Sequence, residues 1–448
     1  MTVRRLDPAK ALVVSFALVI AAGTLALRQP WASQPGRQLA WVEALFTATS
    51  ATCVTGLTIR PPDDHTVAGQ IVILLLIQVG GLGIMTFGLF FSLLIGRRLS
   101  MFGRDLIMTS LAQGPWEDFW PLLRVVMAGT GLIEGTGALL LAAGWWAEKG
   151  WLAVPWGVFH AVSAFCNAGF GLDSASLTPW RGNPLVVIPV GLLIVAGGLG
   201  FLPLTELAER RRKGVRRPLS LHSRTVFAVT AWLLVVGWIA FALLEWETTL
   251  KGLPVGERAL AVWFQSITPR TAGFSTIDFG AANPATLAFT MVLMFIGASP
   301  GSTGGGIKTT TIGVLAAIVI ARVRSRRQVA SFGRRVGDGT AASAVVVTLM
   351  ALLVVVGGMI AVAACEHGAS GGAGARAPFL AQAFDVLSAF GTVGLSTGIT
   401  PSLRASSHLV LTALMFVGRV GPLTFGLALA GRKPRPEPQF VPEELMVG

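Results

Sequence analysis

The sequence predicts an all-α membrane protein built from four helix–re-entrant loop–helix repeats, with eight transmembrane helices and four half-length helices in pseudo-four-fold symmetry. Three observations predict this fold class. The 448-residue chain is 53% hydrophobic and only 13% charged, whereas a soluble protein carries about a quarter charged residues. Apolar runs close to the ~20 residues that span a bilayer recur along the whole chain. One short sequence word occurs four times between these runs.

Charge and cysteine usage narrow the class further. The formal charge of +13 is concentrated in clusters that punctuate the apolar runs, at 4–10, 97–104, 210–224, 322–335 and 432–435. Cytoplasmic loops of membrane proteins have this pattern, so nucleic acid is not expected as a partner. The three cysteines, Cys53, Cys166 and Cys365, are far apart and lack metal-ligand spacing, which argues against a disulfide framework.

The first apolar run, 11–27, follows Arg4 and Arg5 and can be misread as a signal peptide. It is longer than most signal-peptide hydrophobic regions, and the repeat described next requires it. We therefore interpret it as the first membrane helix.

The repeated word is the strongest internal signal. Each copy has an aromatic residue ten positions before a glycine, and each glycine is followed by Leu or Phe: FTATSATCVTGL (46–57), FHAVSAFCNAGF (159–170), WFQSITPRTAGF (263–274) and FDVLSAFGTVGL (384–395). About ten helical residues cover only ~15 Å, so each copy is too short to cross the membrane. The copies therefore predict re-entrant half-helices.

Each copy lies between two longer apolar runs, which gives four units. The predicted spans are 11–27 and 68–95, 120–146 and 184–206, 225–246 and 285–321, and 341–365 and 407–430. The basic clusters fall between units and not within them, so both chain ends are expected in the cytoplasm. The predicted division is 1–96, 97–217, 218–335 and 336–431 for the four repeats, with a tail at 432–448.

The second spans also share glycine-rich words, QVGGLGIMTFG (78–88), VAGGLGFLPLT (195–205), STGGGIKTTTIG (302–313) and FVGRVGPLTFG (416–426). Glycine-rich membrane helices often merely pack closely. Four copies, each downstream of a matching loop, instead indicate an internal repeat.

Four loops around one axis predict a central pore, because irregular backbone at membrane depth is stable only where it is buried or lines a water-filled cavity. Backbone carbonyls there can replace the water around a cation, and a glycine at each loop permits a positive φ. The C-terminal ends of the half-helices favour a cation. Asp385 is the one acidic residue in the four words, so carbonyl ligands indicate a monovalent alkali ion.

These motifs resemble the Trk/Ktr/HKT superfamily of potassium transporters. TCVTGL, SAFCNAGF, TPRTAGF and SAFGTVGLS are similar to its four filter segments, ASPGSTGGGIKTTT to its gating loop, GRVGPLTFG to its last helix, and PEELMVG to its C-terminus. The resemblance covers essentially the whole chain. It is closest to the KtrB membrane subunits, because the extra N-terminal helix pair of TrkH-type members has no room before residue 41.

Carried onto this chain, the resemblance places a potassium filter in four segments, here called lines 1 to 4: residues 52–56, 165–169, 269–273 and 390–394. The residues it assigns to the filter are Thr52, Cys53, Val54, Thr55, Gly56, Cys166, Asn167, Ala168, Gly169, Arg270, Thr271, Ala272, Gly273, Gly391, Thr392, Val393 and Gly394. One shared glycine per line implies selectivity over sodium that is less stringent than in filters with two.

Arg270 and Asn167 stand where the neighbouring lines carry neutral or small residues. A guanidinium beside a cation site would repel the cation. We therefore expect Arg270 to point behind the filter as a structural prop rather than into the ion path.

The stretch GSTGGGIKT at 301–309 is close to a phosphate-binding loop, but it has one extra residue and lies between membrane spans. Nucleotide binding is not expected there. The resemblance instead assigns 297–311 as an intramembrane gate below the filter. The gate residues are Gly297, Gly301, Gly304, Gly305, Gly306, Lys308 and Arg419.

The two cations of the gate need separate interpretations. Lys308 is costly in a membrane unless it faces a cavity or a partner. In the family, the arginine matching Arg419 lies in the pore as an electrostatic barrier. The alternative is a packing salt bridge, for which Glu134 is the most deeply placed acidic candidate. We expect Glu134 to be structural, paired or hydrogen-bonded.

The function implied is potassium uptake across the cytoplasmic (inner) membrane, with potassium as substrate, no cofactor in this chain, and activation by sodium left open. The implied partners are a second copy in a homodimer, the lipid bilayer and a cytosolic RCK-type ring similar to KtrA. The basic loops 210–217 and 322–335 either meet that ring or only set topology. The alternative function is a sodium-selective or sodium/potassium symporting relative, and the four filter glycines favour potassium. An intramembrane enzyme is not expected, because the five histidines are scattered and HExxH does not occur.

Overall fold

The computed structural model describes residues 8–94, 119–213, 219–326, 328–367, 378–422, 424 and 426. The fold is helical, apart from a two-stranded hairpin of β1 (Ala330–Ser331) and β2 (Arg334–Arg335) and single 3₁₀ turns. The basic segments 97–104 and 432–435 and the C-terminal tail lie outside the described residues. The helices are α1 (Pro8–Leu27), α2 (Trp41–Thr52), α3 (Val67–Leu94), α5 (Phe119–Lys149), α6 (Ala153–Phe165), α7 (Pro184–Leu199), α8 (Phe201–Lys213), α9 (Leu221–Glu245), α10 (Val255–Ile267), α11 (Pro284–Phe295), α12 (Thr309–Val323), α13 (Asp338–His367), α14 (Phe379–Gly391) and α15 (Ala405–Val420).

The helices fall into two length classes that match the sequence pattern. Within the described residues, four helical segments are long and apolar enough to cross a membrane, or five if the bent pair α7–α8 is one span. The four contain α1, α5, α9 and α13, which are the predicted first spans of the four units. The helices at the repeated words, α2, α6, α10 and α14, have 12 or 13 residues each. They are half-length helices, as predicted.

In the structure, the helices at two predicted continuous spans are interrupted. The span predicted at 184–206 bends by 99° between α7 and α8. Gly200 separates these helices and has a φ of 86°. The span predicted at 407–430 is likewise interrupted, since α15 ends at Val420 and Gly421 has a φ of 93°. A glycine in this region of φ ends an α-helix, so the break is not confined to the third unit.

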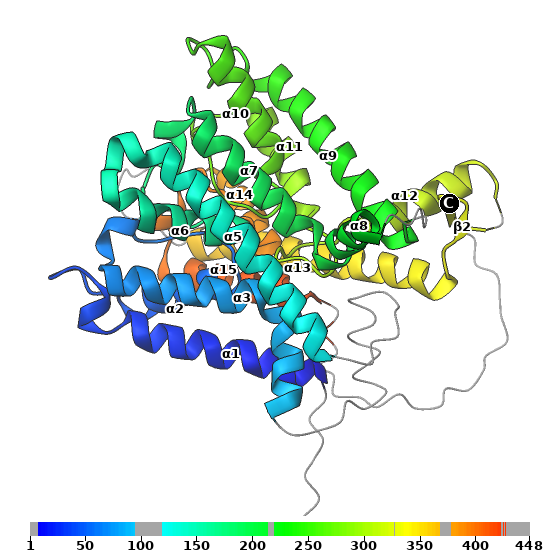
Figure 1. Cartoon of the computed structure of the whole chain (residues 1–448), viewed down its shortest axis with the longest axis horizontal. Helices are drawn as coiled ribbons and strands as arrows, with labels where there is room; N and C mark the ends of the chain where they lie inside the picture. The colour runs from blue at the N-terminus through cyan, green and yellow to red at the C-terminus, as the bar shows by residue number, and fades with distance from the viewer. Residues whose placement is uncertain are drawn as a thin grey trace, which may run out of the picture.

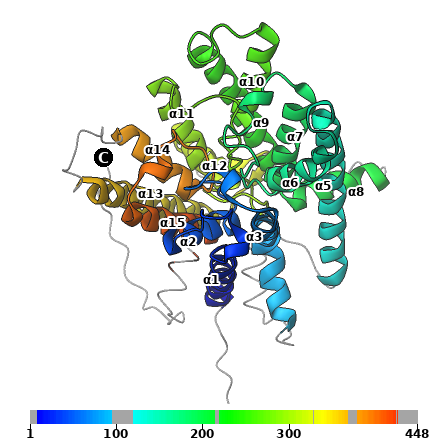
Figure 2. The same cartoon turned by 90° about the vertical axis from the view of Figure 1, so that its left-hand side faces the viewer.

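The helices of successive units pack in a cycle. Each half-helix contacts the first helix of its own unit, in the pairs α1–α2, α5–α6, α9–α10 and α13–α14. Each unit also places a second helix against the next half-helix, in the pairs α3–α6, α7–α10, α11–α14 and α15–α2. The last pair returns to the first unit. Figure 2 shows the result, with α1–α3, α5–α7, α9–α11 and α13–α15 arranged around a common centre.

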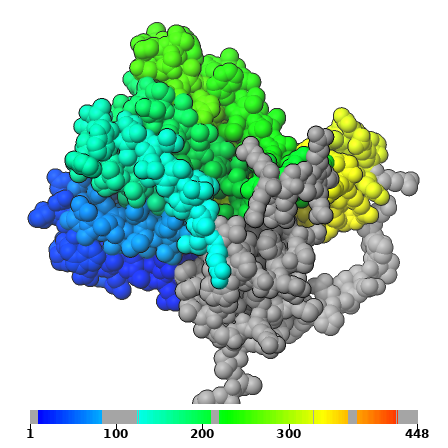
Figure 3. Space-filling view, viewed as in Figure 1, coloured from blue at the N-terminus to red at the C-terminus, as the bar shows by residue number. Residues whose placement is uncertain are grey.

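The apolar core is divided in the same way. Four clusters of buried side chains each join two units: Ala51 with Phe170, Phe165 with Phe264, Met294 with Phe390, and Phe46 with Met415. Within the part of the chain that the structure describes, these four clusters are therefore shared between units. Figures 1 and 3 show the first three units packed side by side on one face, while the α12–α13 hairpin extends to one side.

Polar caps fix where the second helices begin. In units 2 and 3 an Asn-Pro pair starts the helix, and the side chains of Asn183 and Asn283 accept bonds from the N–H groups of Leu185 and Ala285 at 3.0 and 2.9 Å. Asn at the N-cap and Pro at the first helical position are preferred at helix starts. These caps place the second helix of each of these units at a fixed distance from the loop before it.

Carboxylates at the ends of α9 and α13 add a second restraint in units 3 and 4. Glu245 ends α9 and accepts bonds from the Asn283 N–H and the Thr286 hydroxyl. Glu366, near the end of α13, accepts equivalent bonds from the Arg404 N–H at 3.0 Å and the Ser407 hydroxyl at 2.5 Å. The same spacing of donors in two units supports an internal repeat at the level of single bonds.

Candidate functional site: a ring of four loops and the segment beneath it

Lines 1 to 4 follow the C-terminal ends of α2, α6, α10 and α14 and share one backbone conformation. The glycines Gly56, Gly169, Gly273 and Gly394 have φ values of 95°, 71°, 80° and 92°, as the sequence predicts. The residue two positions earlier also has a positive φ, in Val54 (50°), Asn167 (56°), Thr271 (73°) and Thr392 (52°). Sequence reasoning missed this second position, because none of these residues is glycine. Non-glycine residues rarely adopt this conformation, and it costs about 1–2 kcal/mol, so the surrounding structure must enforce it.

The four lines meet in a closed ring. A Cβ atom added at Gly56 would overlap the Ala168 carbonyl oxygen, and one at Gly169 would overlap the Ala272 oxygen. The third contact joins Gly273 to the Val393 oxygen, and the fourth joins Gly394 to the Thr55 oxygen. The carbonyl that precedes each glycine thus faces the neighbouring line. No side chain fits at these positions, which is a second reason, besides φ, for glycine there.

One backbone bond anchors each line to its own half-helix. The residue before the glycine donates its N–H to a carbonyl at the helix end, in the pairs Thr55–Ser50 (2.7 Å), Ala168–Ser163 (2.8 Å), Ala272–Thr268 (3.0 Å) and Val393–Ser388 (2.8 Å). Because the peptide is planar and trans, the carbonyl on the other side of each of these peptides points away from the helix end. Those carbonyls belong to the residues with a positive φ two positions before each glycine: Val54, Asn167, Thr271 and Thr392.

The glycine-rich words of the second helices receive these half-helix ends. A Cβ atom at Gly80, Gly197 or Gly418 would overlap the carbonyl of Thr52, Phe165 or Phe390, respectively. Close packing is therefore the local reason for these glycines. In these three units it brings the C-terminal end of a half-helix close to the second helix of the same unit.

The two atypical line residues lie in different places. Arg270 is 6% exposed, and its Nη2 lies 3.4 Å from the Thr230 hydroxyl of α9. Its side chain therefore points toward an outer helix, as expected for a prop behind the line. The Asn167 side-chain amide lies 3.2 Å from the Thr271 hydroxyl, which links line 2 to line 3.

The segment between α11 and α12, residues 296–308, forms hydrogen bonds with the second and fourth units. The Thr303 hydroxyl donates to the carbonyl of Phe165 at 3.0 Å, and the Gly305 N–H donates to the Thr392 hydroxyl at 3.1 Å. The Ser299 N–H donates to the Gly198 carbonyl at 3.0 Å. Gly301 and Gly306 have φ values of 73° and 66°. The segment is thus packed against lines 2 and 4 and the end of α7.

Lys308 is half-buried at the start of α12, and its ammonium donates to the Gly304 carbonyl at 2.7 Å. It also lies 3.5 Å from the Gly305 carbonyl. The partner of this lysine is therefore the backbone of its own segment, which the charge holds in a compact turn.

Arg419 is 2% exposed and joins the segment to the first unit. Its guanidinium donates to the carbonyls of Thr303 and Gly80, and it lies 3.4 Å from the Gly81 carbonyl. Across the described part of the chain, no acidic side chain forms an ion pair with Arg419. The alternative of a packing salt bridge to Glu134 is therefore wrong.

Glu134 is held elsewhere, as expected for a structural carboxylate. Gln78 of α3 donates to its Oε2 at 3.2 Å, and the Cys166 thiol lies 3.8 Å from its Oε1. This cluster links α3, α5 and line 2 behind the ring. Cys53 and Cys166 are both free thiols and buried.

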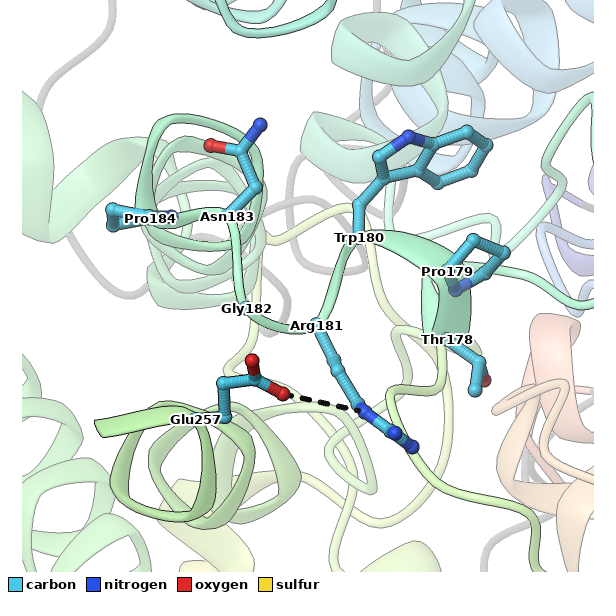
Figure 4. Close-up of a pocket in the computed structure, with 8 residues that line it drawn as sticks. All are labelled: Thr178, Pro179, Trp180, Arg181, Gly182, Asn183, Pro184 and Glu257. Atoms are coloured by element: carbon cyan, nitrogen blue, oxygen red, sulfur yellow. Dashed lines mark ion pairs between the residues drawn. The ribbon is translucent and has the colours of Figure 1, made fainter. Parts of the chain in front are cut away.

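One cavity, of about 710 Å³, lies apart from the ring and is lined by residues 178–184 and Glu257. Figure 4 shows Arg181 and Glu257 facing each other across it, with 3.8 Å between Nε and Oε2. Its one carboxylate is thus already opposite a cation. The cavity contains no residue of lines 1 to 4 and does not resemble a cation site.

The fold and the ring define a helical membrane protein in which four loops converge on a common centre. Residues 4–439 match the family model for TrkH, described as cation transport protein. The chain is 36% identical to the Ktr system potassium uptake protein B of Bacillus subtilis over 95% of this chain and 94% of the relative. It is 36% identical to the potassium/sodium uptake protein NtpJ of Enterococcus hirae over 99% and 98% of the two chains.

The fold comparison agrees with the sequence comparison. The crystal structure of the potassium transporter TrkH from Vibrio parahaemolyticus matches with a TM-score of 0.71 at 18% identity, over 96% of this chain and 86% of that one. The chain therefore belongs to the TrkH family of cation transport proteins, and the resemblance noted in the sequence is confirmed.

Proposed function

We propose that this chain is the membrane subunit of a potassium uptake system and that potassium ions pass through the ring formed by lines 1 to 4. The observation that carries the proposal is the closed set of contacts between each glycine and the carbonyl of the neighbouring line. Rings of backbone carbonyls replace the hydration shell of potassium in selective pores. The names of the Bacillus subtilis and Enterococcus hirae relatives, which describe potassium uptake, support the same ion.

The electrostatics of the ring suit a monovalent cation. The C-terminal ends of four half-helices lead into the lines, and each such end carries a partial negative charge. Asp385, the acidic residue of the four words, is fully buried and accepts bonds from Thr400 at 2.5 Å and Ser396 at 3.2 Å. It therefore supports the loop after line 4, and carbonyl oxygens remain the proposed ion ligands.

The architecture we propose is four repeats, 1–96, 97–217, 218–335 and 336–431, around a pore with pseudo-four-fold symmetry. The cyclic helix packing and the four cores shared between units support this division. In this arrangement the chain is a multi-pass protein of the cytoplasmic membrane, with both termini and the basic clusters on the cytoplasmic side.

The segment 297–311 is the proposed gate, with Lys308 and Arg419 as its charged elements. Its contacts with Phe165 and Thr392 place it directly against two lines. The bonds of Arg419 to Thr303 and Gly80 tie the segment to α3. A cation on the ion path also raises the electrostatic barrier to potassium.

The proposed partners are a second copy of this chain and a cytosolic RCK-type ring. Relatives named as proteins of a Ktr system support membership in an assembly of more than one component. The basic segment 322–335 includes the β1–β2 hairpin, where Arg334 and Arg335 are exposed. It is a candidate contact for that ring.

The second candidate function is uptake of both sodium and potassium, with sodium as co-transported ion or activator. The 36% identity to a protein named for potassium/sodium uptake supports this second candidate function. One glycine shared by all four lines, in place of two, also fits a less stringent filter.

Purified protein in liposomes with an imposed inside-negative potential tests the proposal, because each 100 mV contributes ~2.3 kcal/mol per charge. We expect rubidium uptake that external potassium competes strongly and external sodium competes weakly. Strong competition by sodium would favour the second candidate. Absence of cation uptake by folded protein, with and without a ring subunit from a related Ktr system, would contradict both.

A further inference from the structure

Near the C-terminal end of each half-helix, one of the buried hydroxyls bonds the line that follows. The residues are Ser50, Ser163, Thr268 and Ser388, and all four side chains have an exposed fraction of 0%. Their backbone carbonyls are the same ones that anchor the lines. Each residue therefore contacts its line twice, once through the main chain and once through the side chain.

The side-chain bonds are of two kinds. In lines 1 and 4 the hydroxyl accepts the N–H of the ring glycine, with Ser50 bonding Gly56 and Ser388 bonding Gly394, both at 3.0 Å. In lines 2 and 3 the hydroxyl donates to the carbonyl of the residue after the glycine. Ser163 bonds Phe170 at 2.7 Å, and Thr268 bonds Phe274 at 2.5 Å.

The first kind of bond orients a ring carbonyl. The N–H of Gly56 and the carbonyl of Thr55 belong to one planar trans peptide and point in opposite directions. When Ser50 holds the N–H behind the line, the Thr55 oxygen faces the ring, where it meets Gly394. Ser388 does the same for the Val393 oxygen, which meets Gly273.

The second kind of bond does not involve the peptide that precedes the ring glycine. Ser163 and Thr268 draw the carbonyls of Phe170 and Phe274 back toward the half-helix, beyond the ring glycine. The hydroxyls of lines 2 and 3 thus hold the outer ends of their lines, whereas those of lines 1 and 4 hold the ring itself.

We propose that the hydroxyls of Ser50 and Ser388 set the preference for potassium over sodium by fixing the Thr55 and Val393 carbonyls at the spacing of the larger ion. This inference rests on the proposed function and deepens it. Sodium is smaller, so the carbonyls must move inward to replace its hydration shell. A peptide bonded from behind resists that movement, and one without the bond follows the ion.

The test measures the ratio of potassium to sodium permeation for wild type, Ser50→Ala and Ser388→Ala in liposomes, per amount of folded protein. We expect each variant to lower the ratio about fivefold, the equivalent of one ordinary hydrogen bond, through faster sodium entry. Ser50→Thr keeps the hydroxyl and should keep the wild-type ratio. The two alanine variants lie in different units, so each tests the proposal if the other does not fold.

The chain offers a matched control in the same half-helix. Thr49 is 1% exposed, and its hydroxyl has no hydrogen-bond partner among the described residues. Thr49→Val removes a buried hydroxyl next to Ser50 and should leave the ratio unchanged. Ser163→Ala should change it by less than about twofold.

The outcomes separate the two proposals. A wild-type protein without potassium permeation would contradict the proposed function. A potassium-selective wild type whose ratio is the same in folded Ser50→Ala and Ser388→Ala would overturn the role of the hydroxyls alone. An equal loss of selectivity in Thr49→Val would also overturn it, because general loosening of the half-helix would then be the cause.

Discussion

The ring and the segment 296–308 differ in how they are held: the contacts of the ring are repeated in all four lines, whereas those of the segment occur once. The ring uses one design four times, with a positive-φ residue, a glycine against the neighbouring carbonyl, and an anchor to the half-helix in every line. The segment 296–308 occurs once and is held by single bonds to several different elements. An ion surrounded from four sides needs the same geometry from each side. An element that opens and closes needs only contacts that can be exchanged for water.

Two buried arginines mark the difference between these regions. Arg270 belongs to line 3 but points to Thr230 on an outer helix. Arg419 belongs to a second helix, yet its guanidinium reaches the Thr303 carbonyl of the segment. The position of a charge in the sequence therefore does not decide whether it faces the proposed ion path. The substitutions below compare the two regions, starting with the largest expected effect.

The ring should be the most sensitive part of the molecule. Gly394→Ala places a methyl group against the Thr55 carbonyl at a φ of 92°. The φ alone costs about 1–2 kcal/mol, and the overlap forces lines 1 and 4 apart. We expect rubidium uptake into liposomes to fall by roughly tenfold or more, with weaker discrimination against sodium.

Gly398 provides the matched control for this variant. It has a φ of 88° in the same unit, but a Cβ atom added there meets nothing within 4 Å. Gly398→Ala should carry the same cost of a positive φ, without the overlap, and leave uptake per folded protein within about twofold. If both variants lose transport equally, the close approach in the ring is not what requires glycine.

Much of the ring was predictable because its signal is repeated. A single copy of SAFCNAGF says little, but four spaced copies predict half-helices, loops and the conformation of their glycines. The shared positive φ of Val54, Asn167, Thr271 and Thr392 was not predictable, since Val and Thr usually avoid that region and only Asn adopts it with some frequency. The bonds from the helix end enforce it, and those bonds appear only after folding.

The conformation of the segment and the contacts of its cations were less predictable, because tertiary contacts determine them. The helix break at 296–308 follows from its glycines, whereas the breaks at Gly200 and Gly421 were not predicted. The glycine at the same place in the first unit, Gly83, lies within continuous α3, so the repeated glycine alone does not indicate a break. Identical glycines therefore have different conformations, decided by tertiary contacts. The contacts of Arg419 are with backbone carbonyls of Thr303 and Gly80, which no side-chain pattern in a sequence can indicate.

The segment should respond in the opposite direction to the ring. Arg419→Ala removes charge-assisted bonds, each worth about 1.5–3 kcal/mol, between the segment and α3. We expect the segment to be held less firmly against α3 and potassium flux to rise by roughly tenfold in liposomes. Shortening the loop 297–311 should act in the same direction.

Arg404 supplies the control for charge. It is an exposed arginine at the start of the same helix, α15, so Arg404→Ala lowers the net charge equally without touching the segment. We expect flux within about twofold of wild type, since exposed charges are strongly screened. Unchanged or lower flux in folded Arg419→Ala protein would contradict the role of the gate.

The smallest functional effect is expected at Arg270, although it lies within a filter line. Arg270→Ala removes a buried side chain that packs behind line 3 and contacts Thr230 at 3.4 Å, so it should lower the free energy of unfolding by about 1–3 kcal/mol. Thermal unfolding in detergent measures that loss. Flux and the potassium-to-sodium ratio per folded protein should stay within about twofold, because no charge leaves the proposed ion path. A rise in flux like that of Arg419→Ala would place the Arg270 guanidinium on the path, and the ring would then contain a barrier of its own.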